Sequence, residues 1–257
     1  MSQTPAMSDM KSRMERAAEM KDEDKLYKRE GILYSTILSP PETLDKLKDL
    51  EAREDDLILK LAEMPPRRLL GTHLHPDNIP PSFFTKKPKI LVVFRNPKDT
   101  LVSYYHFMNK NPVLPSAEPW DKFFSDFMAG EVAWGSYFDH ALAWEKRLDD
   151  PNVMIVTYEE LKQNLPEGVK KISEFFSLPL TDEQVSSIAG ESTFSAMLEN
   201  SQKSHGNFGS IFFRKGEVGD WKNHFSDAQS KQMDELFKAK LAGTNLGARL
   251  KYDLYCQ

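Results

Sequence analysis

The stretch Lys89–Phe107, KILVVFRNPKDTLVSYYHF, decides the fold class of this chain. After Lys89 it begins with a continuous run of apolar and β-branched residues, which is typical of a buried strand. The segment Arg95-Asn96-Pro97-Lys98-Asp99 reads as a turn, and TLVSYYHFM then has the apolar spacing of a helix. The sequence therefore predicts a buried strand, a turn and a helix in direct succession.

Further elements repeat this alternation on the C-terminal side. A second buried strand is expected at Val153–Tyr158, after the turn Asp149–Asn152. The expected helices are Trp120–Met128, Tyr137–Leu148, Glu167–Phe176, Asp182–Ala189 after Thr181 as N-cap, and Asp227–Ala242, opened by a Ser226/Gln229 capping box and closed by Gly243. Strands that alternate with helices predict an α/β fold with a mostly parallel sheet.

The N-terminal third of the chain gives weaker patterns. Residues 1–30 are highly charged and predict a frayed helix or a loose arm, followed by a single domain over 31–257. A short helix is expected at Glu42–Glu51 and the start of a strand at Leu57. Between two double prolines, only Arg68–His73 is expected to be extended, as a strand flanked by loops.

Composition excludes several classes of protein. The 257 residues are 40% hydrophobic and 28% charged, close to globular averages, with a net charge of −5 that offers no general attraction for nucleic acid or anionic lipid. Any anion site must therefore be local. The sequence contains no apolar run of the roughly 18 residues that a membrane helix needs. Its charged N-terminus does not resemble a secretory signal. The single cysteine, Cys256, agrees with a cytoplasmic protein.

Two segments carry residues suited to binding an anion. Arg95 directly follows a strand, and Ser103 lies about two turns into the next helix, so both could hold one phosphate at the carboxyl end of the sheet. The alternative is an ion-paired arginine and an ordinary surface hydroxyl. The segment Phe212–Asn223 has adjacent cations, two glycines and flanking aromatics, which suit a lid over a nucleotide phosphate. The alternative here is a solvated basic loop held by Trp221.

Taken together, these segments resemble a known family. RNPKDTLVSYYHF (Arg95–Phe107) and RKGEVGDWKNHF (Arg214–Phe225) are similar to two motifs of the cytosolic sulfotransferases, which transfer a sulfonate from 3′-phosphoadenosine 5′-phosphosulfate (PAPS) to a hydroxyl or amine. THLHPDNIP, VTYEELK and STFSAM match further family segments in order, and the resemblance covers residues 30–257. THLH and the C-terminal GTNLGARLKYDLYCQ resemble the 6B branch. The implied fold is a P-loop-like, three-layer α/β fold with helices on both faces of the sheet.

The resemblance also implies roles for individual residues. The 3′-phosphate would be held by Arg95, Ser103, Arg214, Lys215 and Gly216. The adenine would be lined by Tyr158, Thr193, Phe194, Met197 and Phe212, with Trp221 as a support; the alternative for these side chains is core packing.

The resemblance implies that His73 is the general base. An imidazole with an ordinary pKa near 6.5 can accept the proton of the acceptor at cytoplasmic pH. His75 lies two residues on, but a histidine pair without a third ligand is a weak indication of a metal, and the family uses none.

One family segment is not found in this chain. The family begins with a strand, a loop of the type Tyr-Pro-Lys-Ser-Gly-Thr-Thr-Trp that binds the 5′-phosphosulfate, and a helix. Here only Leu61–Pro66 separates Lys60 from Arg67, whereas such a crossover unit needs roughly 30 residues or more. We therefore expect the fold to lack one strand–loop–helix unit, as if an exon were skipped, and to expose apolar surface and an edge of the sheet.

Other departures concern the catalytic lysine, the dimer contact and the acceptor. Gly71 stands where the family has a lysine, two residues before its histidine. The dimer motif is expected from Lys222 onward, but Ser226-Asp227 and Lys231 stand at its key places, which leaves a homodimer open. An apolar acceptor pocket for an alcohol or phenol could be formed by Phe83, Phe84, Phe107, Trp134 and Phe138, which could equally be core.

Three hypotheses about the function of this chain follow from its sequence. The first is a PAPS-dependent sulfotransferase whose activity is impaired, because the loop that would neutralise the transferring group is missing. The second is a pseudoenzyme that binds adenosine 3′,5′-bisphosphate or pairs with a full-length relative. The third is a chain without a stable fold.

Overall fold

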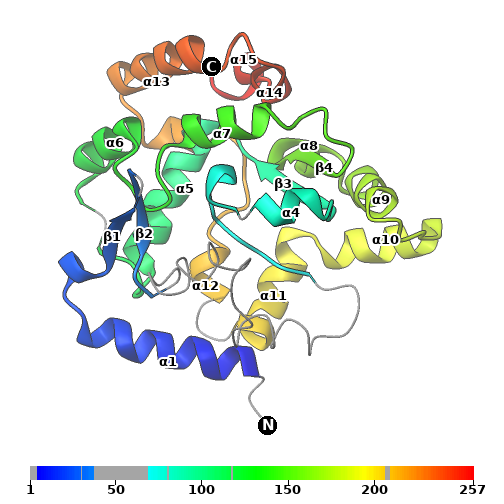
Figure 1. The fold of residues 1–257 in the computed structure, drawn as a ribbon, viewed down its shortest axis with the longest axis horizontal. Coiled ribbons are helices and arrows are strands. Elements are labelled where there is room, and N and C mark those ends of the chain that lie inside the picture. Colours follow the sequence, from blue (N-terminus) through cyan, green and yellow to red (C-terminus); the bar gives the residue numbers. More distant parts are fainter. Residues whose placement is uncertain (1–4, 30, 38–68, 80, 117, 206–208) are drawn as a thin grey trace.

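The computed structural model describes residues 5–29, 31–37, 69–79, 81–116, 118–205 and 209–257. The expected helix at 42–51, the strand expected from residue 57 and the short junction at 60–67 all lie outside these residues. Among the described residues, the secondary structure is mainly helical, with two small sheets (Figure 1).

The N-terminal part contains a helix and a hairpin. Helix α1 (Pro5–Glu19) and the short 3₁₀ turn η1 (Asp22–Asp24) precede strands β1 (Leu26–Arg29) and β2 (Ile32–Ser35), which pair antiparallel through Gly31 at φ 81°. Ala17 and Tyr34 are fully buried. Of the two alternatives for the N-terminal segment, the structure has the helix, and that helix contributes to the core.

The second sheet carries the two strands expected from the sequence. β3 (Ile90–Phe94) and β4 (Val153–Thr157) pair in parallel, with Val92 opposite Ile155 and Val93 opposite Val156. Helix α5 (Pro97–Lys110) follows β3, and helix α8 (Tyr158–Gln163) follows β4, so both strands direct their carboxyl ends toward the starts of helices. The α/β class and the parallel pairing are confirmed.

The remaining elements are helices. In chain order they are η3 (Pro76–Asn78), α4 (Pro81–Thr85), α6 (Trp120–Ala129), α7 (Tyr137–Glu145), α9 (Leu165–Phe175), α10 (Asp182–Glu191), α11 (Phe194–His205), α12 (Gly209–Phe212), η5 (Asp220–Asn223), α13 (Asp227–Lys240), α14 (Asn245–Arg249) and α15 (Tyr252–Tyr255). Of these, α6, α7, α9, α10 and α13 lie within three residues of their expected bounds, and the others were not expected. The expected N-cap at Thr181 and the expected capping box at Ser226 are both formed, and Thr181 also forms a capping box with Gln184. Helix α13 ends at Lys240 with Leu241 as its C-cap, so the expected stop at Gly243 was wrong by two residues.

The main core lies on one face of the parallel sheet. Val92, Phe94 and Ile155 belong to the same buried cluster as Leu101 of α5 and Phe138 of α7. In Figure 1, α13, α14 and α15 lie together at the end of the molecule that carries the C-terminus. Met233, Leu246 and Leu250 from these helices are fully buried in the cluster, so the C-terminal segment completes the core.

The other face of β3 is partly uncovered. Val93 is 55% exposed, whereas its neighbour Val92 is 8% exposed. The expectation of a buried strand was therefore wrong at Val93, because no described element covers this position. The expectation of exposed apolar surface on the sheet is confirmed at the same residue.

The segment before the first histidine is also not a strand. Residues 69–73 have no regular secondary structure, and Leu69 and Leu70 are 87% and 52% exposed. The expectation of an extended strand at Arg68–His73 was wrong over these residues, because a strand needs a hydrogen-bonded neighbour and none of the described strands pairs with this segment.

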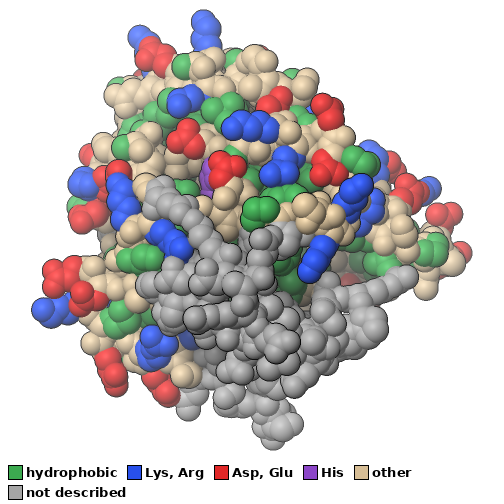
Figure 2. All heavy atoms as spheres, viewed as in Figure 1, with side chains coloured by type: hydrophobic (Ala, Val, Ile, Leu, Met, Phe, Trp, Pro, Cys, Tyr) green, Lys and Arg blue, Asp and Glu red, His purple; other side chains and the backbone are tan. Residues whose placement is uncertain are grey.

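The visible surface has no field of one sign. On the face shown in Figure 2, acidic and basic side chains are interspersed. Among the described residues, no helix is both long enough and apolar enough to cross a membrane. An anion site in this protein must therefore be built locally, by a few converging cations.

The uncovered face of β3 yields a paired mutational test. Val92→Thr should lower the free energy of unfolding by about 1–3 kcal/mol, because it buries a hydroxyl without a partner. Val93→Thr should change it by less than about 0.5 kcal/mol, because the hydroxyl remains in water. Urea unfolding measures both, and an equal loss for the two variants would contradict an exposed Val93.

Candidate functional site

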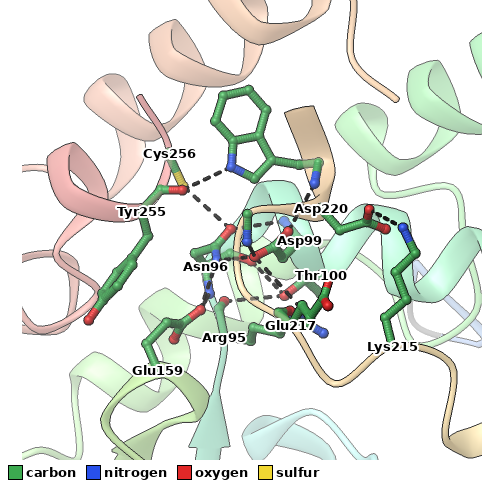
Figure 3. Close-up of polar contacts among 12 residues, drawn as sticks. Arg95, Asn96, Asp99, Thr100, Glu159, Lys215, Glu217, Asp220, Tyr255 and Cys256 are labelled. Carbon is green, nitrogen blue, oxygen red and sulfur yellow. Dashed lines mark hydrogen bonds and ion pairs between the residues drawn. The ribbon is translucent and has the colours of Figure 1, made fainter. Parts of the chain in front are cut away.

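The carboxyl end of β3 is organised by the start of helix α5. Asn96 is the N-cap of this helix, and its side-chain oxygen accepts a hydrogen bond from the backbone N–H of Asp99 at 2.8 Å. Pro97 occupies the first helical position, where its missing N–H costs nothing. This local geometry turns the Asp99 carboxylate back toward the end of the strand (Figure 3).

Asp99 joins the two sequence motifs. Its buried carboxylate accepts hydrogen bonds from the side-chain amide of Asn96 at 2.8 Å, from the backbone N–H of Gly219 at 2.7 Å and from that of Trp221 at 3.1 Å. Gly219 lies at φ 93°, a conformation that residues with a Cβ rarely adopt. The loop Arg214–Gly219 is thereby fixed over the start of α5.

Glu159 connects the second strand to the same network. It is buried at the start of α8, directly after β4, and its Oε1 accepts from both the backbone and the side-chain nitrogen of Asn96, at 2.9 and 2.8 Å. The ends of β3 and β4 are therefore held together by side chains as well as by the sheet.

The C-terminus supports this network from behind. Trp221 is buried, and its indole N–H donates to the carbonyl oxygen of Tyr255 at 2.9 Å. The fully buried Lys98 lies with its Nζ 4.2 Å from the Trp221 ring centre and donates to the carbonyl of Cys256 at 2.6 Å. The structure thus places Trp221 beneath the loop as a packing residue. Burial raises the pKa of the Cys256 thiol, so Cys256 is a neutral core residue.

Arg95 lies between an aromatic ring and the loop of the second motif. Its guanidinium is 4.4 Å from the centre of the Tyr158 ring, and its Nη2 donates to the carbonyl oxygen of Glu217 at 2.6 Å. The same Nη2 lies 3.7 Å from the Asp99 carboxylate, so the expected alternative of an ion-paired arginine is present. Within the part of the chain that the structure describes, the buried Nε of Arg95 has no hydrogen-bond partner. A buried cationic N–H without a partner is costly, and an anion at this position would satisfy it.

Arg214 and Lys215 converge on a single carboxylate. Arg214 Nη2 and Lys215 Nζ lie 2.5 and 2.6 Å from the two oxygens of Asp220, whose side chain is almost fully buried. Burial by itself would raise the pKa of Asp220, but the hydrogen bonds from Lys215, Asn223 and Arg214 outweigh it and hold the pKa well below its usual range. Asp220 thus holds both cations in place at the start of this turn.

Gly216 brings the loop against a neighbouring helix. It lies at φ 65°, and a Cβ at this position would come within 2.2 Å of the Phe194 ring of α11. Any larger residue would push the loop away from this helix. The two expected glycines therefore have separate roles. Gly219 donates its N–H to Asp99, whereas Gly216 allows the loop to approach Phe194.

The expected adenine-lining residues lie around the same loop. Tyr158 carries the Arg95 guanidinium, and Phe194 packs against Phe213 at 5.9 Å. Met197 and Phe212 are 39% and 48% exposed, which leaves apolar surface available to a flat ring. Thr193 donates its hydroxyl proton to the carbonyl of Gly190, a local turn contact. Ser103 is half-buried on α5, which contacts α12.

His73 lies in the irregular segment before η3. Its ring packs against Trp134 with 4.9 Å between the ring centres. Burial lowers the pKa of His73 from its ordinary value of 6.5, so the imidazole is neutral, and able to accept a proton, over a wider pH range. This property suits a general base.

His75 belongs to a structural contact. Its Nδ1 accepts from the backbone N–H of Asp77 at 3.3 Å, and its ring lies 5.8 Å from that of His140. Among the residues that the structure describes, no three His, Cys, Asp or Glu side chains gather as a metal site would require.

The aromatic residues expected at an acceptor pocket divide into two groups. Phe138 is 2% exposed and belongs to the core, and Phe84 packs under the Arg147 guanidinium, so neither is free to meet a small molecule. Trp134 contacts His73, and Phe107 lies 5.8 Å from Phe212. The two described cavities, of about 400 and 290 Å³, lie at β4 and α9 and involve none of these residues.

Sequence reasoning missed the acidic residues of this site. Asp99, Glu159 and Asp220 were not singled out, although each receives the hydrogen bonds that position a cation or a loop. The Asn-Pro-x-Asp spacing from Asn96 indicates a helix start, which could have directed attention to Asp99. No sequence pattern pairs Asp99 with Gly219, because 120 residues separate them.

Comparisons with known proteins agree on one family. The family model described as "Sulfotransferase domain" matches residues 14–245. Sulfotransferase 6B1 of Danio rerio is 74% identical and is covered in full by 98% of this chain, and the Mus musculus protein of the same name is 53% identical over 80% of this chain and 68% of its own length. The crystal structure of mouse sulfotransferase SULT7A1 complexed with PAP matches with a TM-score of 0.80 at 33% identity, covering 89% of this chain and 99% of that one.

The alignment with the Danio rerio protein also contains a gap. It extends over 296 residues, whereas this chain has 257 in all, so at least 39 positions of that relative have no counterpart here.

The Asp99 network gives a direct stability test. Asp99→Asn replaces one accepting oxygen by an N–H that would face another donor, so the free energy of unfolding should fall by about 1–3 kcal/mol. The exposed Asp149 provides the matched control, and Asp149→Asn should change it by less than about 0.5 kcal/mol. Denaturant unfolding measures both; a neutral Asp99→Asn would mean that the loop is held by other contacts.

Proposed function

This chain belongs to the sulfotransferase family and is a transferase with PAPS as its sulfonate donor, and we propose that the 3′-phosphate of the donor is held by Arg95, Ser103, Arg214, Lys215 and Gly216. The observation that carries this assignment is the buried, unpartnered Nε of Arg95 next to the loop that bears Arg214 and Lys215. A phosphate there would accept from that N–H and would lie beside the cations Arg214 and Lys215.

We assign the binding of the adenine to side chains near this loop. The residues we assign to it are Tyr158, Thr193, Phe194, Met197 and Phe212. Phe194 lies against Gly216 of the loop, and Met197 and Phe212 offer exposed apolar area for stacking. The PAP complex of the mouse protein supports the binding of a nucleotide by this chain, since PAP is the desulfated donor. Trp221 supports the loop from below and makes no contact with the nucleotide.

His73 is proposed as the general base. It would accept the proton of the acceptor's hydroxyl or amine as that atom attacks sulfur, while the sulfur–oxygen bond to the bisphosphate breaks. Its lowered pKa keeps it neutral at cytoplasmic pH. Its contact with Trp134 supports an acceptor with apolar character, such as an alcohol or phenol, bound beside Trp134.

The cellular setting follows from composition. The single buried cysteine supports a reducing cytoplasm, and the interspersed surface charges support a small-molecule acceptor over a nucleic acid or a membrane. For a homodimer the family's dimer motif is poorly matched, because Ser226-Asp227 and Lys231 stand at its key places, and Ser226 is the N-cap of α13.

We further propose that catalysis by this chain is weak. The phosphosulfate loop is not found in the sequence, and the gap of at least 39 positions against the Danio rerio protein is large enough to hold the whole strand–loop–helix unit. The exposed Val93 supports the loss of an element that would cover the sheet. Positioned donors on the transferring group are worth on the order of 10²–10³ each in rate.

A second candidate function is nucleotide binding without efficient turnover. The same gap favours it, because the groups that hold the 3′-phosphate and adenine are present while those for the sulfonate are not. The protein would then bind adenosine 3′,5′-bisphosphate, alone or beside a full-length relative.

Nucleotide binding can be tested by isothermal titration with adenosine 3′,5′-bisphosphate. The chain should bind it, and Arg214→Ala should weaken binding tenfold or more, since a charge-assisted hydrogen bond contributes about 1.5–3 kcal/mol. The exposed Lys146 is the control, and Lys146→Ala should leave the affinity unchanged. Equal affinities for the two variants would remove Arg214 from the site.

Turnover can be tested with PAPS and a panel of alcohols, phenols and amines. Sulfonation should be at least about 100-fold slower than with the Danio rerio relative measured in parallel, because the cradle for the transferring group is missing. A rate equal to that of the relative would show that the phosphosulfate is held by other residues and would contradict the proposed impairment.

A further inference from the structure

Two histidines from separate elements face each other next to the proposed 3′-phosphate site. His106 lies on α5, and His224 is the C-cap of η5. Their Nε2 atoms are 2.9 Å apart and their rings meet edge to face, at 5.1 Å and 82°. Neither residue has a role in the function proposed above.

The hydrogen bonds of His224 fix where the protons lie. Its Nδ1 is 3.1 Å from the carbonyl oxygen of Asp220, which can only accept, so this nitrogen carries a proton. When both rings are neutral, the Nε2 of His224 must accept from the Nε2–H of His106. One added proton leaves this hydrogen bond intact, because the free Nδ1 of His106 can hold it. A second added proton would place two N–H groups face to face and break the hydrogen bond between the two Nε2 atoms.

The pair is linked to the phosphate-binding cations through Asp220. The residue whose carbonyl receives His224 also holds Arg214 and Lys215 with its carboxylate. The charged groups that act on His106 are Arg214 and Lys110, which repel a proton, and Asp220, which attracts one; the rings packed against the pair belong to Tyr105 and Trp120.

The nucleotide-free protein disfavours the extra proton. Burial lowers the pKa of His106, and the positive charges of Arg214 and Lys110 lower it further, against the opposing effect of the Asp220 carboxylate. A bound phosphate would neutralise Arg214 and add negative charge beside the pair, and both changes favour protonation.

We propose that the His106–His224 pair takes up one proton when the 3′-phosphate of the nucleotide binds, so that the affinity for the nucleotide rises as the pH falls. This inference rests on the proposed 3′-phosphate site at Arg214 and Lys215. The sign follows from linkage: a group whose pKa is higher in the bound state favours binding below that pKa, and the gain is lost as the pH rises above it. A difference of half a unit to one unit corresponds to about three- to tenfold in affinity.

Proton uptake can be counted by isothermal titration. Adenosine 3′,5′-bisphosphate is titrated into the whole chain at pH 6.0 and 7.5, in buffers of different ionisation enthalpy, and the buffer dependence of the heat gives the protons taken up. The test variant is His106→Gln, whose side-chain amide can donate to His224 in place of Nε2–H but cannot titrate. His224→Gln is the second variant, and a cooperative melt qualifies either one.

The nucleotide has its own titrating phosphates, so the difference between proteins is the readout. The nucleotide contributes equally to the wild type and the variants. We expect the wild type to take up more protons than either variant at pH 6.0. From pH 7.5 to 6.0, its affinity should rise about threefold or more beyond the rise seen in the variants. Both differences should vanish with adenosine 5′-monophosphate, which lacks the 3′-phosphate.

The possible outcomes separate the two proposals. Equal proton uptake and equal pH profiles in the wild type and variants would overturn the role of the histidine pair and leave the nucleotide site in place. A difference that persists with the 5′-monophosphate would also overturn it, because the linkage would not involve the 3′-phosphate. No binding of the bisphosphate by the wild type would overturn the proposed site itself, and this inference with it.

Discussion

The carboxylate of Asp99 is the interaction on which the rest of the site depends. It is buried at the start of α5 and receives two backbone N–H groups from a loop that lies 120 residues away in the sequence. Buried acceptors are stable only when fully paired, so this carboxylate requires the loop as much as the loop requires it. Through it, the positions of Arg95, Arg214 and Lys215 are set by one network rather than by three independent side chains.

The hydrogen-bond network around Asp99 is held by further contacts from β4 and from the C-terminal residues. Glu159 joins it to β4, and the carbonyls of Tyr255 and Cys256 hold Trp221 and Lys98 beneath it. A site that must receive a multiply charged nucleotide benefits from such rigidity, because the cations are already in place and little ordering remains to oppose binding. The histidine pair extends the same network two turns further along α5, because His106 follows Asp99 by seven residues.

The sulfonate side of the reaction contrasts with this completeness. The proposed nucleotide side has a buried frame, whereas the sheet beside it exposes Val93, and none of the described strands pairs with the segment before His73. A family member with an intact nucleotide frame and an incomplete phosphosulfate cradle would bind its desulfated donor better than it turns the donor over. This imbalance follows from the modular build of the fold, in which one strand–loop–helix unit supplies a distinct part of the site.

The sequence by itself determined the elements and the family. The apolar run from Ile90, the capping residues Thr181 and Ser226, and the two motifs that begin at Arg95 and Arg214 are local signals, and local backbone preferences suffice to interpret them. Only the tertiary structure decided which face of β3 is covered, that Asp99 receives Gly219, and that His106 meets His224. These contacts join residues more than 100 positions apart, and no local pattern encodes them, because each depends on how separately formed elements pack.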